Sequence, residues 1–429
     1  MIIQRKTYLD RLVGKMHNGQ IKVITGIRRC GKSFLVFNIF RDYLRELGVP
    51  DDHVIEVALD DDENEALRDV DELSKHIRSR ISSDGTMHYV LLDEVQLAIT
   101  REEMRDPDRQ VRLYGLLNGL LRMGNVDVYV TGSNSKMLSK DVATEFRGRG
   151  DTVRVHPLSF SEYYSYVGGD RLQAFGQYML FGGMPLALAK TSPEEKFAYL
   201  NDLFEEVYFQ DILERYEIEL PSVLSELVDD LCSSVGSLTN PTKIANTLET
   251  VKHIKVDNET IAAYLDHLEE SFMFSKARRY DVKGKHYFDY PNKYYCEDVG
   301  LRNVRLGLRQ QEETHIMENI VYNELVARGY SVDIGVVQIV EKDEEGKRHQ
   351  KNCEIDFIAR KGNRQVYIQS AYSMTDPLKE EAELRPLLAV RDFHKRVVVS
   401  QSIMPPWVDE AGVLRLGIYD FLLDEGLIK

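Results

Sequence analysis

The sequence has no apolar run near the ~18–20 residues that would span a bilayer, so we expect no membrane association. It has only four cysteines, which are far apart and form no CxxC pair: Cys30, Cys232, Cys296 and Cys353. This scarcity argues against a disulfide framework or a zinc site and favours a reducing, cytoplasmic environment. Residues 1–6 contain no apolar stretch before a small-residue cleavage site, so we expect no secretory signal.

The chain also lacks the positive charge that a general polyanion binder carries, because its net charge is −15 over 429 residues. The charge is unevenly spread. Residues 1–50 and 271–310 are basic, whereas residues 51–75 are strongly acidic. The basic regions permit local phosphate binding but do not demonstrate it. The length exceeds what one hydrophobic core accommodates and predicts about three domains.

What the first 155 residues do contain is an alternation of strand-like and helical stretches. We expect strands at 21–25, 54–59, 89–92 and 126–130, each rich in β-branched or other apolar residues. Continuous apolar strands separated by helices indicate an α/β fold with a parallel sheet that is covered on both faces.

A glycine-rich motif follows the first of these strands: Gly26-Ile27-Arg28-Arg29-Cys30-Gly31-Lys32-Ser33 matches G-x4-G-K-S. Glycines allow backbone N–H groups to face phosphates, and the helix that follows adds its positive end. Lys32 would reach the β- and γ-phosphates, and the Ser33 hydroxyl would coordinate Mg²⁺. The motif predicts a site for ATP with Mg²⁺, and the residues that we expect to contact the nucleotide are Gly26, Arg28, Arg29, Cys30, Gly31, Lys32, Ser33 and Phe34.

Two carboxylates, Asp93 and Glu94, follow the strand at 89–92. Asp93 would hold the magnesium ion through water, and Glu94 would polarise the attacking water. The alternative is that they are two solvated acids at a strand end. Their position behind the glycine-rich motif favours the catalytic interpretation.

Further candidates follow the strand at 126–130. Asn134 and Ser133 could contact the γ-phosphate or the attacking water, but they could equally cap the next helix. Arg147 and Arg149 flank a glycine and could neutralise transition-state charge in their own site or in a neighbouring subunit. They could equally be surface arginines, and both alternatives stay open.

These motifs resemble those of AAA-type ATPases of bacteria and archaea. The similarity rests on Gly-Ile-Arg-Arg-Cys-Gly-Lys-Ser at 26–33, Leu-Leu-Asp-Glu-Val-Gln at 91–96, Thr-Gly-Ser-Asn-Ser at 131–135 and Arg-Gly-Arg at 147–149. The chain is more specifically similar to a family in which this ATPase domain carries a C-terminal domain of unknown function. The match extends over essentially the whole length, through residues 157–162, 182–185, 293–295 and 298–303.

The resemblance implies ATP binding, ATP hydrolysis, a winged-helix middle and a C-terminal fold of the restriction-endonuclease type. We accordingly expect an ATPase domain at 1–155, a helical domain at 156–235, a winged-helix-like domain at 236–305 and a PD-(D/E)XK nuclease-like domain at 306–429.

The winged-helix region gives a divided indication about DNA. Its second helix carries Glu259, Asp266, Glu269 and Glu270 and would repel phosphates. The hairpin that follows, 276–285, is basic and is interleaved with aromatic residues, so it could bind a nucleic-acid backbone. The alternative is a structural winged helix that packs against the ATPase domain.

The C-terminal region resembles the nuclease pattern incompletely. Asp356 matches the metal-binding aspartate, but Gln369 replaces the second acid and Ala371 replaces the lysine that assists the attacking water. Glu318 and Glu354 could substitute as acids, and Lys351 could be a migrated lysine. We expect a degenerate domain that does not cut nucleic acid.

Together these features predict an ATP-binding protein, with slow Mg²⁺-dependent hydrolysis, that acts as a nucleotide-driven switch. One alternative is a DNA-handling ATPase or mobile-element accessory protein. Another is a signalling or scaffold protein that self-associates on binding ATP and needs no nucleic acid.

Overall fold

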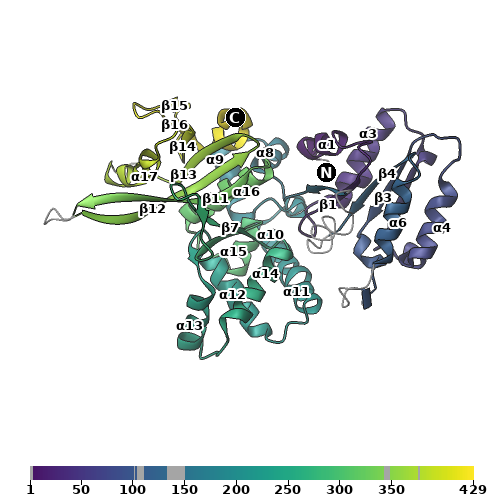
Figure 1. Ribbon diagram of the computed structural model, residues 1–429, viewed down its shortest axis with the longest axis horizontal. Helices are drawn as coiled ribbons and strands as arrows, with labels where there is room; N and C mark the ends of the chain where they lie inside the picture. The colour runs from purple at the N-terminus through teal and green to yellow at the C-terminus, as the bar shows by residue number, and fades with distance from the viewer. Residues whose placement is uncertain (1–2, 101, 104–110, 133–149, 343–347, 375–376) are drawn as a thin grey trace. The chain divides into compact units, whose positions relative to one another are not determined.

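The computed structural model describes residues 3–100, 102–103, 111–132, 150–342, 348–374 and 377–429 (Figure 1). The chain forms two compact units. The first comprises residues 1–157 with 270–272, and the second comprises 158–269 with 273–429. The four cysteines are free thiols. None of the helices in the described ranges combines the length and the apolarity that crossing a membrane would require.

The first unit is built on a five-stranded sheet in the order β2-β3-β4-β1-β5, and every neighbouring pair in it is parallel. The expected strands are present as β1 (Ile21–Thr25), β2 (Val54–Ala58), β3 (His88–Asp93) and β4 (Val126–Thr131). The sequence analysis missed β5 (Gly150–Arg154), an edge strand in which only Val153 is fully buried. The first unit is therefore an α/β fold with a parallel sheet.

Helices cover both faces of this sheet, as the continuous burial of β1, β3 and β4 requires. One face packs on apolar residues of α4 (Val70–Arg80) and α6 (Arg112–Leu121). On the other face, Phe40 packs on Tyr129 with ring centroids 4.5 Å apart. Phe40 belongs to a helical stretch that the structure divides into α2 (Lys32–Phe34), a π-helical segment η1 (Leu35–Phe40) and α3 (Arg41–Glu46). The remaining elements are α1 (Lys6–Val13) and the 3₁₀ turns η2 (Asp51–His53), η3 (Asp62–Arg68) and η4 (Val95–Ala98).

The second unit begins with helices, as expected. They are α8 (Phe160–Val167), α9 (Arg171–Phe181), η6 (Pro185–Ala189), α10 (Pro193–Asp202), η7 (Leu203–Phe209), α11 (Gln210–Arg215) and α12 (Pro221–Ser233). Two further helices, α13 (Pro241–Lys252) and α14 (Asn258–Glu270), lie between the first and second strands of a three-stranded antiparallel sheet. Its order is β6-β10-β7, formed by β6 (Leu238–Thr239), β7 (Phe274–Ala277) and β10 (Asn292–Cys296).

The hairpin between β7 and β10 belongs to a different sheet. Its strands β8 (Arg279–Asp281) and β9 (His286–Tyr287) pair with each other, and β8 also runs parallel to β11 (Ser331–Lys342). This edge completes an eight-stranded sheet of order β15-β16-β14-β13-β12-β11-β8-β9. The basic hairpin, which was expected to project as a wing, thus extends the C-terminal sheet, because its backbone groups pair with β11.

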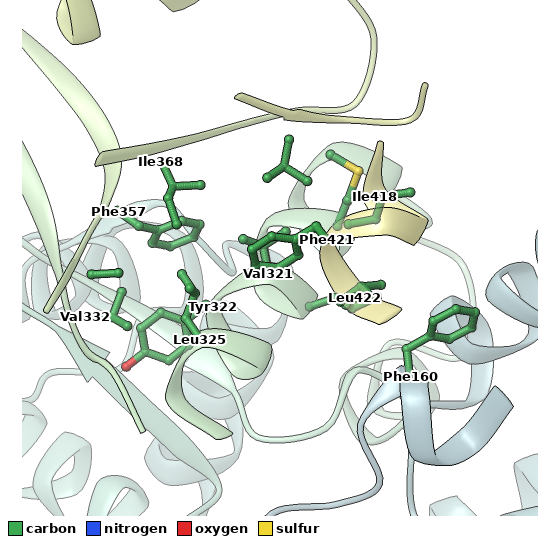
Figure 2. Packing of buried hydrophobic residues seen from close by; sticks show 14 of the residues in the cluster. Phe160, Val321, Tyr322, Leu325, Val332, Phe357, Ile368, Ile418, Phe421 and Leu422 are labelled. Carbon is green, nitrogen blue, oxygen red and sulfur yellow. The ribbon is translucent and has the colours of Figure 1, made fainter. Parts of the chain in front are cut away.

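The other strands of this sheet are β12 (Arg348–Lys361), β13 (Arg364–Ala371), β14 (Lys395–Ser400), β15 (Trp407–Val408) and β16 (Val413–Gly417). Helix α16 (Glu313–Ala327) covers one face. There Val321, Tyr322 and Leu325 pack against Phe357 and Ile368, alongside α18 (Ile418–Leu423) (Figure 2). Leu387 of α17 (Pro377–Ala389) packs on the opposite face. The remaining short elements are α15 (Val299–Arg305) and η8 (Glu425–Ile428).

Two glycine-containing motifs of the second unit meet at Asp298. Its side chain accepts the Gly300 N–H at 2.9 Å, which caps α15, and also the Gly183 N–H at 2.6 Å. A Cβ on Gly182 would overlap the Asp298 carboxylate, and one on Gly300 would overlap the Phe181 carbonyl. Burial raises the pKa of Asp298 to about 6. These motifs therefore have a packing role, since they allow α9 and α15 to approach closely.

Candidate functional site

The glycine-rich loop connects β1 to α2 at the carboxyl end of the parallel sheet. Because β4 lies between β1 and β3, the residues that follow these three strands share one edge. Open α/β sheets bind their ligands at this edge. The topology therefore brings Lys32 and Ser33, Asp93 and Glu94, and Thr131 into one region.

The loop needs its glycines for two reasons. Gly26 has φ 142° and Gly31 has φ 101°, which are conformations that L side chains rarely adopt. A Cβ on Gly26 would also overlap the Val155 carbonyl. Arg29, with φ 63°, is a non-glycine residue in the left-handed region, and such strain is concentrated at functional sites.

Residues that follow β5 support the glycine-rich loop through hydrogen bonds. The Cys30 thiol is buried and donates to the Val155 carbonyl at 3.4 Å, so the cysteine side chain supports the loop and only its backbone is near the phosphate side. Arg5 donates to the Cys30 carbonyl at 3.1 Å and to the His156 carbonyl at 2.7 Å. This role of Arg5 could not be predicted from the sequence, because its partners are 25 and 151 positions away.

Lys32 is almost completely buried, with 3% of its surface exposed. Its ammonium donates to the Gly26 carbonyl at 3.0 Å and to the Ile27 carbonyl at 3.1 Å. Both partners are neutral and belong to the same loop. A phosphate could therefore displace them at small electrostatic cost, because no carboxylate would be left unpaired.

Asp93 lies at the end of β3 with two hydroxyl partners. Thr131 donates to its carboxylate, and Ser33 also bonds to it. Burial raises the pKa of Asp93, and these two hydrogen bonds oppose the increase. A serine hydroxyl and a carboxylate provide the hard oxygen ligands that Mg²⁺ prefers, so the side chains fit the ion. Thr131 belongs to the 131–135 motif, but its contact with Asp93 was not predicted from the sequence.

Glu94 begins a sharp turn, with φ 49° and ψ 48°. Its backbone N–H donates to the Thr131 hydroxyl at 3.2 Å, and its carboxylate accepts a hydrogen bond from the Gln96 amide. The two carboxylates therefore have different partners, Gln96 for Glu94 and the Thr131 hydroxyl for Asp93. One strand end thus presents two acids with different surroundings.

The other nucleotide-site candidates are less defined. Phe34 is 37% exposed, Arg29 is exposed and Arg28 is half-buried. Asn134, Arg147 and Arg149 lie outside the described residues, as does Ser133.

The basic residues of the hairpin have partners within the second unit. The Lys276 ammonium lies 3.8 Å from Asp266 and 3.7 Å from Glu269, which are acids of α14. Arg278 stacks on Tyr287 at 4.1 Å from the ring centroid, and Arg279 stacks on Phe288 at 5.1 Å. The interleaving of basic and aromatic residues therefore stabilises the hairpin itself.

The nuclease-like residues are brought together in a different combination from the one expected. Asp356 and Gln369 are adjacent, since the Asp356 N–H donates to the Gln369 side-chain oxygen at 3.3 Å. Lys351, the expected migrated lysine, is exposed on β12. The lysine in this cluster is Lys293 from β10, which the sequence could not indicate because it lies in another sheet.

With this geometry in place, comparisons with known proteins can be interpreted. A family model described as an AAA domain matches residues 18–164, and one described as a domain of unknown function (DUF8612) matches residues 172–312. An uncharacterized protein of Haemophilus influenzae is 32% identical over 404 residues, which cover 93% of each chain. The chain belongs to the family of this protein, with an AAA domain in its N-terminal part. An uncharacterized protein of Methanocaldococcus jannaschii is also similar, with 26% identity over 395 residues that cover 88% of this chain and 80% of that protein.

Similarity to solved structures is weak. The Aeropyrum pernix ORC1 protein, solved in complex with DNA, is 11% identical with a TM-score of 0.32, over 76% of this chain and 94% of that one. A Vibrio cholerae protein is 12% identical with a TM-score of 0.20, over 87% and 96%. Scores this low carry no argument about fold or function.

Proposed function

We propose that the first unit binds ATP with Mg²⁺ and hydrolyses it slowly, and that the protein works as a nucleotide-driven switch. The observation that carries this proposal is the convergence of Lys32, Ser33, Asp93 and Glu94 at one edge of the parallel sheet. Membership of an AAA-domain family supports nucleotide binding independently.

Binding would begin with an exchange of partners. The Lys32 ammonium leaves the Gly26 and Ile27 carbonyls and takes the β- and γ-phosphate oxygens, while the loop N–H groups and the start of the following helix face the phosphates. Mg²⁺ neutralises phosphate charge when bound. Ser33 and Asp93 would hold it, and Thr131 keeps the Asp93 carboxylate oriented.

Hydrolysis would depend on Glu94 as the group that accepts a proton from the attacking water. Its carboxylate is bonded to Gln96, so this contact must loosen or rearrange before Glu94 reaches a water at the γ-phosphate. We infer slow turnover from this competition. Asn134, Arg147 and Arg149 remain proposals from the sequence, as does self-association through an arginine acting on a neighbouring subunit.

Calorimetric ATP titration and a turnover assay on two variants test the proposal. Lys32→Ala should lose detectable binding, because it removes the ammonium group that we expect to contact the β- and γ-phosphates. Glu94→Gln should bind ATP normally and lose turnover by about 10²–10⁴-fold.

Two exposed residues of the same unit supply matched controls, Lys75→Ala and Glu63→Gln. Both should bind and hydrolyse ATP like the unmodified protein. Normal turnover in Glu94→Gln would overturn its assignment, and normal binding in Lys32→Ala would overturn the nucleotide site.

A further inference from the structure

A buried ammonium lies among carboxylates in the second unit, outside the nucleotide site. Lys293 of β10 is 5% exposed. Its Nζ is 3.0 Å from Glu318 Oε1 on α16 and 2.6 Å from Glu354 Oε1 on β12. Burial alone would lower the pKa of Lys293, but the surrounding carboxylates raise it above its ordinary value. The side chain is therefore a fixed positive charge.

The neighbouring polar groups are already engaged. Glu318 Oε1 also accepts the Tyr295 hydroxyl at 2.7 Å, and the Asp356 carboxylate accepts the Ser370 N–H at 2.8 Å. Gln369 is bonded at both ends of its amide, to the Asp356 N–H and to Glu383 at 2.7 Å.

The resemblance to PD-(D/E)XK nucleases implies a divalent metal here, but these residues fit one poorly. Such an ion needs several ionised oxygen ligands. The Asp356 carboxylate already accepts the Ser370 N–H, and Gln369 offers a neutral amide oxygen in place of a second acid. Within the described ranges, no three His, Cys, Asp or Glu side chains group as a metal site. The Lys293 ammonium also contacts the Glu318 and Glu354 carboxylate oxygens that a metal would need as ligands.

We propose that the Lys293 ammonium takes the place of a divalent cation in this carboxylate cluster, and that the second unit consequently binds no metal there. Lys293 comes from the three-stranded sheet, whereas Glu318 and Glu354 belong to α16 and to the eight-stranded sheet. The substitution has a structural consequence. A diffusible ion would only neutralise the acids. Lys293 also connects β10 to α16 and β12.

Metal binding in nucleotide-free protein tests the proposal, with Mn²⁺ as the probe. Unmodified protein and Asp356→Asn should give the same Mn²⁺ titration by electron paramagnetic resonance. Any Mn²⁺ that both proteins bind must then be bound outside the carboxylate cluster. Lys293→Met keeps the length of the side chain and removes its charge, so it should gain a site. At about 100 times the dissociation constant, Mn²⁺ should raise the Tm of the second unit by about 5 °C.

Two control variants locate the gained site. Lys293→Arg keeps the charge and should gain no Mn²⁺ effect, and adding Asp356→Asn to Lys293→Met should abolish the gain. The proposal is wrong if Lys293→Met folds without gaining a site, or if the gain survives Asp356→Asn. If Lys293→Met does not fold, the comparison of unmodified protein with Asp356→Asn still decides, because Mn²⁺ binding that requires Asp356 contradicts the proposal.

Discussion

Lys32 in the first unit and Lys293 in the second unit are both buried, yet they are held by opposite chemistry. Lys32 donates to two neutral carbonyls of its own loop, and the nearby Asp93 carboxylate is bonded to two hydroxyl groups. Lys293 donates directly to two carboxylates from other elements. A lysine held by dipoles can be recruited by an incoming anion, whereas a lysine held by buried charges cannot leave without exposing them. The arrangement of Lys32 therefore suits a ligand site, and that of Lys293 suits a permanent contact between structural elements.

The largest effect that this comparison predicts is on stability. Lys293→Ala should lower the free energy of unfolding of the second unit by about 3–5 kcal/mol, because it leaves buried carboxylates without a cation. Lys32→Ala should cost the first unit about 1 kcal/mol, because only neutral partners are lost. The single tryptophan, Trp407, is in the second unit, so its fluorescence during urea unfolding reports that unit. Equal losses for the two variants would break the comparison.

Next in size is the effect of Gly26→Ala. The left-handed backbone and the overlap with the Val155 carbonyl predict a loss of about 2–4 kcal/mol in the first unit, together with loss of ATP binding. Gly115→Ala is the matched change, because a Cβ there meets nothing within 4 Å. It should keep full ATP binding. Thermal unfolding and calorimetry check both, and intact binding in Gly26→Ala would show that the loop is less constrained than its geometry indicates.

A smaller effect is expected where glycine serves packing alone. Gly300→Ala should destabilise the second unit by about 1–3 kcal/mol through overlap with the Phe181 carbonyl, and should leave ATP binding unchanged. Gly176→Ala, in α9, faces open space and should be neutral or stabilising by about 1 kcal/mol. Urea unfolding followed by Trp407 fluorescence distinguishes them. Similar values for the two variants would contradict the close approach of α9 and α15.

The smallest effect concerns Lys283 and Lys285, which are exposed at the tip of the hairpin. DNA affinity should be weak and insensitive to sequence, because most basic groups of the hairpin contact its own aromatic rings or acids. Replacing Lys283 and Lys285 with glutamate should remove it, and the affinity of the unmodified protein should fall steeply with salt. Fluorescence anisotropy at several salt concentrations measures this. Sequence-specific binding that survives the change would indicate another surface.

The sequence predicted what depends on neighbours along the chain. Four strands of the first sheet and the glycine-rich loop follow from apolar periodicity and from turn chemistry within a few residues. Thr131 escaped attention because it reads as an ordinary strand residue, and only the parallel register brings it to Asp93. β5 was missed because an edge strand need not be apolar throughout. Lys293 could not be placed, since its partners are 25 and 61 positions away in other elements.

The hairpin of β8 and β9 has a consequence for how the second unit can be divided. Its residues lie between β7 and β10 in the chain, yet β8 pairs with β11, which follows α16. A cut placed after residue 305 would leave the hairpin without its partner and the eight-stranded sheet without its edge. During synthesis, β8 must also wait about fifty residues for β11 to emerge, although β7 and β10 can already pair. The three-stranded and the eight-stranded sheets therefore share one stretch of chain and cannot readily be exchanged one without the other. We expect them to be inherited, expressed and lost together.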